Sequence, residues 1–406
     1  MAEHILYIHQ YFVTPQMSGG TRSYEMARRL VADGHNVTIL TSNRANGFRW
    51  PSRETVEGIN VIWVPCPYSN AYGPIRKMAS FSLFALVACF YVLWLRYDLI
   101  FATSTPLMTG VPALFAKWLR RKRYVFEVRD LWPEMPIAVG SIRNPVLIWI
   151  LKRLESAIYR NATALVGLSP GMTAGIKGVL AKCNETRPVF TAPNSCDFDK
   201  MPSPGKPEYD AARMRVRDSL NIRPDQTMLL YAGTFGLLND LEYVCDLAAV
   251  TLDNPNIVYV LVGSGIRAPA IKERVAQEGL TNVRLTGRIA KNMAMDHFAA
   301  CDIGLSLFVD IPEMEKNSAN KFFDTLAAGK PAIINYGGWQ GDFLTQTGVG
   351  VQLPRDVVQA KENLASFIED DMPKLTADTV HKAATQFGRD SVYAELYKAI
   401  SRAFSR

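Results

Sequence analysis

The chain has 406 residues, of which 48% are hydrophobic and 20% charged. This length exceeds one ordinary hydrophobic core and predicts two domains, and the composition indicates a well-packed globular protein. Residues 1–200 carry 23 Lys and Arg against 13 Asp and Glu, whereas residues 201–406 carry 22 against 25, so an anionic partner is expected at the first half.

The cysteines and the first residues indicate where the protein works. Six cysteines lie scattered without a CxxC pair, which is typical of a reducing compartment. Residues 5–8 begin a strand with no basic segment or cleavage site before them, so no secretory signal is expected. The sequence therefore predicts a cytoplasmic protein.

The first elements read as strand, loop, helix and strand. Residues 5–8 are a short apolar run, and a loop containing Gly19 and Gly20 leads into a helical pattern that starts at Arg22. Adjacent glycines at a helix N-terminus let backbone N–H groups approach an anion, although a tight turn uses the same residues. The spacing differs from GxGxxG, which disfavours a classical dinucleotide site.

Two segments of the first half could meet a membrane. Residues 78–95 contain no charged side chain, but a strand pattern follows at once, which favours a helix packed on a sheet or on a membrane surface over a true span. A basic cluster then follows, formed by Trp118, Arg120, Arg121, Lys122 and Arg123. It suits an anionic lipid surface or a solvated helix end, and no nucleic-acid motif accompanies it.

Charged residues follow the strand expected at residues 124–128. Arg129 and Asp130 come directly after it, at the end of a strand where α/β proteins place their ligands. The alternative is an ion pair that fixes the loop. Further on, Asp197 and Asp199 form a DxD pattern beside a Pro-rich run, which favours a linker turn over a metal site.

The second half repeats strands that end in glycine and hydroxyl residues. Strands expected at 228–232, 258–262 and 283–286 lead to loops at 233–236, 263–265 and 287–288, as a nucleotide-diphosphate site requires. Residues 320–335, NKFFDTLAAGKPAIIN, then predict an amphipathic helix, a Gly stop and a buried strand. Lys321 and Asp324 share one face of that helix, either as a ligand site or as a surface ion pair.

The order of these motifs resembles a known family. GGTR, VRDLWPE, PNSCDFD, YAGTFG, LVGSG, LTGR and NKFFDTLAAGKPAII look like a family 4 retaining glycosyltransferase of GT-B fold, across nearly the whole chain. The motifs are most similar to the bacterial O-antigen and capsule branch called L-fucosamine transferase-like. The resemblance implies an α/β fold with two Rossmann-like doubly wound parallel-sheet domains that face each other across a cleft. Their expected bounds are 1–195 and 196–384, with a helix at 385–406 crossing back to the first domain.

The resemblance also implies an activity and its residues. It predicts a hexosyltransferase that uses a nucleotide sugar, by family habit UDP-linked, without metal or other cofactor. The acceptor would be a saccharide on undecaprenyl diphosphate or another polyprenyl diphosphate, and the protein would lie peripherally on the inner face of the cytoplasmic membrane. Residues matching the family's donor site are Gly233, Thr234, Gly236, Gly263, Gly265, Arg288, Lys316, Asn320, Lys321 and Asp324. Those expected at the reaction centre are Gly19, Gly20, Arg22, Arg129 and Asp130.

Two departures leave alternatives open. The family often places a Lys or Arg after its first glycine loop of the second domain, where this chain has Leu237, Leu238 and Asn239. It also often has two glutamates eight positions apart, where this chain has Lys316 and Asp324. Arg22 or Lys316 would then supply the missing charge. A GT-B epimerase that hydrolyses a UDP-sugar, or an inactive membrane-associated scaffold, are the alternative functions.

Overall fold

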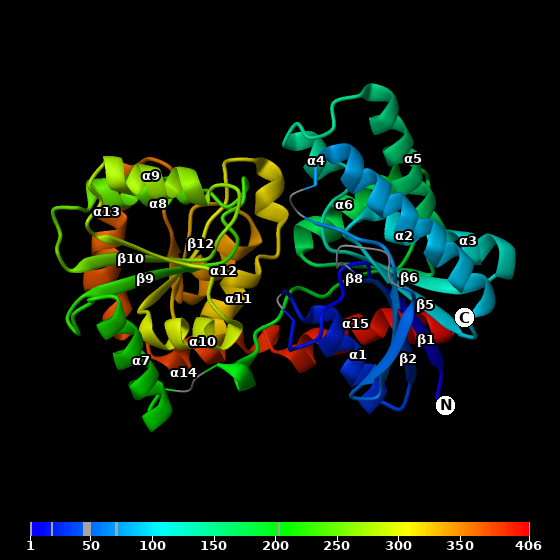
Figure 1. Cartoon of the computed structure of the whole chain (residues 1–406), viewed down its shortest axis with the longest axis horizontal. Helices are drawn as coiled ribbons and strands as arrows, with labels where there is room; N and C mark the ends of the chain where they lie inside the picture. The colour runs from blue at the N-terminus through cyan, green and yellow to red at the C-terminus, as the bar shows by residue number, and fades with distance from the viewer. Residues whose placement is uncertain (1, 18, 44–49, 70–71, 202–203, 406) are drawn as a thin grey trace. The chain divides into compact units, whose positions relative to one another are not determined.

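The computed structural model describes residues 2–17, 19–43, 50–69, 72–201 and 204–405, and it divides into two compact units (Figure 1). Unit 1 consists of Met1–Pro193 and Val392–Arg406, and unit 2 is Asn194–Ser391. The sequence places these two borders after residues 195 and 384. Each unit holds its own sheet with helices on both faces, as the doubly wound pattern predicts.

Unit 1 contains an eight-stranded sheet of order β3-β4-β2-β1-β5-β6-β7-β8, parallel except for the β3–β4 pair. Its strands are β1 (His4–Ile8), β2 (Asn36–Ser42), β3 (Ser52–Val56), β4 (Ile59–Val64), β5 (Leu99–Thr103), β6 (Arg123–Val128), β7 (Ala164–Gly167) and β8 (Val189–Thr191). The antiparallel strand β3 is not predicted by the apolar pattern, because its first four residues are exposed at the sheet edge.

Helices cover both faces of this sheet (Figure 1). They are α1 (Arg22–Ala32), α2 (Pro74–Trp94), η1 (Leu107–Thr109), α3 (Gly110–Arg120), α4 (Glu134–Ala138), α5 (Pro145–Asn161), α6 (Pro170–Ala181) and α15 (Arg389–Phe404). In β1, Leu6 and Ile8 pack with α2, α3, α5 and α6, whereas Ile5 and Tyr7 pack with α1 and α15. Because successive side chains of a strand point to opposite faces of the sheet, this buried strand contributes to two separate cores.

Helix α2 lies against the sheet. By length and composition, Ile75–Trp94 is one helix of the described chain that could cross a membrane, with a mean hydropathy of 1.7 and a third of the segment buried. Phe84, Ala88 and Val92 belong to the core, while the opposite side exposes Leu86 and Phe90. The structure therefore agrees with the packed helix that the following strand predicts.

Unit 2 contains a six-stranded parallel sheet of order β11-β10-β9-β12-β13-β14. Its strands are β9 (Thr227–Ala232), β10 (Ile257–Val262), β11 (Val283–Gly287), β12 (Ile303–Ser306), β13 (Ala332–Ile334) and β14 (Gly350–Gln352). Its helices are α7 (Pro207–Ser219), α8 (Leu241–Val250), α9 (Ala268–Gln277), α10 (Lys291–Ala300), α11 (Asn320–Ala327), α12 (Trp339–Thr347), α13 (Val357–Ser366) and α14 (Ala377–Ala384). Short helical turns are η2 (Phe198–Lys200), η3 (Pro312–Lys316), η4 (Phe367–Asp371), η5 (Met372–Lys374) and η6 (Thr385–Phe387).

Helix α11 forms as its sequence predicts. Phe322, Leu326 and Ala327 are fully buried on one side, and Lys321 and Asp324 are partly exposed on the other. Gly329 ends the segment with a φ of +68°, a left-handed conformation that glycine adopts without strain. Burial of the apolar side fixes the direction in which Lys321 projects.

One carboxyl group in unit 1 opposes folding when it ionises. Glu155 in α5 is buried, and burial together with the nearby Glu134 carboxylate raises its pKa to about 8. The pKa of Glu155 is higher in the folded state than in the unfolded state. The neutral carboxyl group therefore makes its full contribution to stability only below the unfolded pKa of 4.5. That contribution is lost as the pH rises towards 8.

We therefore expect Glu155→Gln to raise the free energy of unfolding at pH 9 by roughly 2–4 kcal/mol and to change it little at pH 4. Thermal denaturation of the parent and the variant at both pH values measures the difference. Glu185→Gln is the matched control, because Glu185 is only partly buried and pairs with Arg187 on the surface. A gain of equal size at pH 4 and pH 9 would show that the effect comes from packing and not from ionisation.

Candidate functional site

Two glycine loops lie side by side at the carboxyl edge of the unit 2 sheet. Phe235 N donates to Ser264 O at 3.0 Å, and Gly233 N donates to Val262 O at 2.9 Å. Gly263 has a φ of +143°, and a Cβ at this position would lie 1.8 Å from Gly233 O. The close contact between the loops therefore requires Gly263, whatever the loops bind.

Lys321 projects over the first of these loops. Its Nζ lies 3.0 Å from Asn239 Oδ1, and 5.1 and 5.6 Å from the ring centroids of Tyr231 and Phe308. Burial lowers the pKa of the ammonium to about 8, and the charge of Asp324 opposes this shift. A partly buried ammonium gains more from an incoming anion than a fully exposed lysine would.

Two polar residues follow the first loop, and the first of them contacts Lys321. Asn239 Oδ1 accepts from Lys321 Nζ at 3.0 Å, and Asn239 Nδ2 donates to Thr234 O at 2.9 Å. The next residue, Asp240, accepts from Asn335 Nδ2 at 2.9 Å and Arg355 Nη1 at 2.5 Å. Sequence reasoning missed these roles, because Asn335 and Arg355 are distant in the chain.

The other donor-site residues lie on neighbouring segments of unit 2. Asn320 is exposed at the first position of α11, and Lys316 is partly buried at the end of η3. Arg288 is exposed beyond β11, and the bond from Gly263 N to Gly287 O at 2.9 Å joins its strand to the second loop. The structure thus groups Lys321 and both glycine loops, with Arg288 at the end of the strand next to them.

The lowered pKa of Lys321 predicts how the affinity for an anionic ligand depends on pH. A diphosphate binds the protonated amine, so its affinity should be greatest below pH 8 and fall by up to about tenfold per pH unit above it. Isothermal titration of UDP between pH 7 and pH 9.5 measures this dependence. Lys321→Arg, which stays charged throughout, should flatten the profile. A parent profile as flat as that of this variant would show that Lys321 does not hold the phosphates.

A second polar cluster lies at the carboxyl edge of the unit 1 sheet. Thr105, beyond β5, donates from Oγ1 to Asp130 Oδ2 at 2.6 Å, and Arg129 Nη1 lies 3.3 Å from His9 Nε2. Burial raises the pKa of Asp130, whereas the bond from Thr105 and the charge of Arg129 oppose the rise. His9 was missed, although it directly follows β1 and so meets the same strand-end criterion as Asp130.

Arg22 has a different role from the one expected. The structure places it inside unit 1, where its guanidinium bonds Glu127 at 2.8 Å and the carbonyl oxygens of Ala192 and Pro193. All three of its nitrogens are used, so it is not available to supply the missing charge of an anion site. Gly19 and Gly20 are exposed in the loop before α1, and Gly19 has a φ of +140°.

The basic cluster after α3 is also partly structural. Arg120 donates to the carbonyl oxygens of Val92 and Leu95 at the end of α2, and Lys122 donates to Tyr97 O at 2.5 Å. Arg123 donates to the carbonyl oxygens of Ala403 and Phe404. Trp118 and Arg121 remain exposed. The sequence predicts four cations available to a lipid surface. In the structure, three of these four side chains donate hydrogen bonds to backbone carbonyl oxygens of unit 1.

The DxD pattern belongs to the segment at the start of unit 2. Asp197 pairs with Arg389 at 2.6 Å and with Lys200 at 3.2 Å. Across the described ranges, no three His, Cys, Asp or Glu side chains gather into a set that could hold a metal ion.

Comparison with known proteins relates this architecture to glycosyltransferases. Residues 19–182 match the glycosyl transferase 4-like domain. A candidate colanic acid biosynthesis glycosyl transferase, WcaI of Escherichia coli, is 23% identical over 291 residues, which cover 67% of this chain and 68% of that protein.

Two solved structures are similar over almost their entire length. Sucrose-phosphate synthase (tll1590) from Thermosynechococcus elongatus has a TM-score of 0.76 and 15% identity, covering 99% of both chains. Anabaena Alr3699/HepE in complex with UDP-glucose has a TM-score of 0.68 and 16% identity, covering 98% of this chain and 99% of that one. The chain therefore has the GT-B fold of these solved structures, and residues 19–182 match the glycosyl transferase 4-like domain.

Proposed function

We propose that the protein moves a sugar from a nucleotide-diphosphate sugar, UDP-linked, to a saccharide on a polyprenyl diphosphate. The observation that carries the donor assignment is Lys321, a partly buried cation over the first of two adjacent glycine loops at a sheet edge. Similar structures were solved with UDP and with UDP-glucose, which supports the same class of donor.

In the proposed reaction, the bond between the anomeric carbon and the diphosphate oxygen breaks, and the acceptor oxygen bonds to the same face of that carbon. The acceptor proton passes to the departing diphosphate, so that no protein nucleophile is required. Lys321 stabilises the charge that develops on the leaving group, and Asp130 accepts a hydrogen bond from the acceptor hydroxyl or the transferred sugar. No metal takes part in this proposal.

The proposed setting is the synthesis of a bacterial surface polysaccharide at the inner face of the cytoplasmic membrane. The likeness to WcaI, whose name refers to colanic acid biosynthesis, supports this setting, and an L-fucosamine transferase-like donor specificity is the corresponding finer proposal. A polyprenyl acceptor would require the enzyme to work at a lipid surface.

The outer side of α2, α3 and α5 supports such a location. Large exposed apolar side chains gather on these helices: Leu86, Phe90, Trp94, Trp118, Leu119, Val146, Trp149 and Ile150. Residues 74–97 and 110–123 contain no Asp or Glu, and Glu155 in α5 is buried. An apolar surface with basic residues and without exposed acids fits an anionic bilayer.

We expect the double replacement of Trp94 and Trp118 by Ser to reduce sedimentation with acidic liposomes, and added salt to weaken binding of the parent. These side chains are 74% and 61% exposed and suit the membrane interface, and the electrostatic part of binding is screened within about 8 Å at physiological salt. Met214→Ser, an exposed position in unit 2, is the control. If the double variant sediments like the parent, the acceptor reaches the enzyme by another route.

A donor-hydrolysis and transfer assay, with and without lipid-linked acceptor, tests the activity. Transfer that requires acceptor supports the proposal. Hydrolysis or epimerisation of the UDP-sugar without acceptor would instead favour the related GT-B epimerase. Absence of donor turnover would favour an inactive scaffold, the alternative that the missing loop cation permits.

A further inference from the structure

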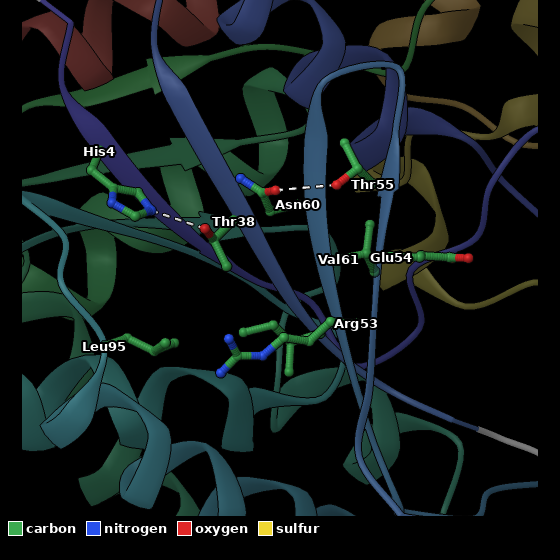
Figure 2. Close-up of a pocket in the computed structure, with 9 residues that line it drawn as sticks. His4, Thr38, Arg53, Glu54, Thr55, Asn60, Val61 and Leu95 are labelled. Atoms are coloured by element: carbon green, nitrogen blue, oxygen red, sulfur yellow. Dashed lines mark hydrogen bonds between the residues drawn. The ribbon is translucent and has the colours of Figure 1, made fainter.

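An open pocket of about 340 Å³ lies on the unit 1 sheet (Figure 2). The residues that line it come from β1, β2, β3, β4 and the end of α2: His4, Thr38, Arg53, Glu54, Thr55, Asn60, Val61, Ile62 and Leu95. Because His4 begins β1 and Ile59 begins β4, the pocket belongs to the amino ends of parallel strands. It is therefore separate from the proposed reaction centre.

Strand alternation turns the polar side chains into this pocket. Arg53 pairs with Ile62 and Thr55 pairs with Asn60 across the β3–β4 hairpin, and Ile62 belongs to the core that α2 covers. Glu54 lies on the other face, where it accepts a hydrogen bond from Trp63 Nε1 at 2.8 Å. Its carboxylate therefore points away from the basic side chain beside it, as Figure 2 shows.

The pocket offers hydroxyl, amide and imidazole groups around one cation. His4 Nε2 lies 2.9 Å from Thr38 Oγ1, and Thr55 Oγ1 donates to Asn60 Oδ1 at 3.4 Å (Figure 2). The nearby Asp98 carboxylate accepts from the His4 backbone N–H at 2.9 Å. Within the described part of the chain, Arg53 is exposed and forms no hydrogen bond or ion pair, and its guanidinium points into the space in front of Leu95.

The pocket adjoins the apolar surface described above. Leu95 follows Trp94 directly, and Arg120 joins the end of α3 to the same turn through the carbonyl oxygens of Val92 and Leu95. Trp94 and the exposed Arg96 therefore lie next to a pocket residue in the chain, and α3, which carries Trp118, is joined to the same turn. A molecule with an anionic, hydroxylated end and an apolar tail would match both surfaces at once.

We propose that this pocket binds the phosphodiester headgroup of an anionic glycerophospholipid, with Arg53 on the phosphate and the polar side chains of Thr38, Thr55 and Asn60 on the headgroup hydroxyls. The inference rests on the membrane attachment in the proposed function and adds a specific lipid site to it. Arginine suits this role because its fork of N–H donors matches phosphate oxygens.

Vesicle flotation tests the proposal, using phosphatidylcholine vesicles with and without phosphatidylglycerol. Arg53→Gln should lower binding to the anionic vesicles about fivefold or more, the factor expected for one cation near such a surface. Asn60→Leu, which fills the pocket without changing charge, should lower it similarly. Arg402→Gln removes an exposed charge from α15, on the opposite face of the sheet, and should bind like the parent.

A soluble probe separates the pocket from general surface charge. Short-chain dihexanoyl phosphatidylglycerol, below its micelle concentration, should bind the parent, Arg402→Gln and Arg96→Gln, and should not bind Arg53→Gln or Asn60→Leu. Circular dichroism and thermal denaturation of each variant confirm that unit 1, which carries all four positions, is folded.

The outcomes distinguish this inference from the proposed function. If the parent binds anionic vesicles and the two pocket variants bind equally well, the headgroup site is wrong while membrane attachment stands. If the parent does not bind anionic vesicles, the headgroup site and the proposed membrane attachment are both wrong. If glycerol 3-phosphate binds through Arg53 but the vesicles do not respond to its loss, the ligand is a free phosphate ester and the lipid assignment is overturned.

Discussion

Lys321→Ala should reduce donor affinity and turnover by at least ten- to a hundredfold without unfolding the protein. A charge-assisted contact to phosphate contributes roughly 1.5–3 kcal/mol, and each 1.4 kcal/mol is about a factor of ten. The fold should persist because Phe322, Leu326 and Ala327, on the buried side of α11, hold the helix. Titration with UDP and steady-state assays with the UDP-sugar measure both quantities.

Asp324→Ala should have a comparable effect on donor use, because we expect Asp324 to bind the ribose hydroxyls. Lys361→Ala is the control for both variants, since Lys361 pairs with Asp253 on exposed surface of the same unit. Normal donor affinity and turnover in Lys321→Ala and Asp324→Ala, with the control also normal, would remove α11 from the site.

The second large effect is expected at Asp130. Asp130→Asn keeps the size of the side chain and an oxygen that can accept from Thr105, but it removes the carboxylate. If Asp130 receives a hydrogen bond from the reacting hydroxyl, transfer should fall about a hundredfold or more while UDP affinity stays unchanged. Single-turnover transfer measured beside UDP titration separates the two effects.

Asp98→Asn is the matched control, because Asp98 lies at the start of β5 whereas Thr105 and Asp130 lie beyond the ends of β5 and β6. Transfer at the parent rate in Asp130→Asn would show that the residue only braces its loop. A loss of UDP affinity together with transfer would indicate instead that the substitution disturbs the protein broadly.

The sequence predicts the donor side of the site because its signals are local. Helix α11 shows its apolar face, its Gly stop and the spacing of Lys321 and Asp324 within a few residues. The hydrogen bond from Lys321 to Asn239, and those from Asn335 and Arg355 to Asp240, could not be predicted, since the partners lie far apart in the chain. Polar partners joined by the tertiary fold have no short-range pattern in the chain.

The misassignment of Arg22 has a physical reason. Its position behind two glycines suits an anion site, but Glu127 lies in β6 among the buried Phe126 and Val128. A fully buried carboxylate needs cationic or hydrogen-bonding partners, and the fold supplies Arg22 together with the Thr103 hydroxyl. The carboxylate of Glu127 inside a buried strand was therefore the sequence signal that a buried cation such as Arg22 would be needed. The exposed strand β3 left no comparable signal, because it has no apolar face.

The composition of unit 1 has a consequence for synthesis on the ribosome. Val392, Leu396, Ile400 and other residues of α15 belong to a core whose remaining members precede position 193. At about 5–20 residues per second, translation of the intervening unit takes on the order of tens of seconds. During that interval one face of the first sheet lacks its last helix. The apolar face of the nascent chain must therefore be kept from aggregating until α15 emerges. A chain terminated within unit 2 would have an N-terminal half with an incomplete core.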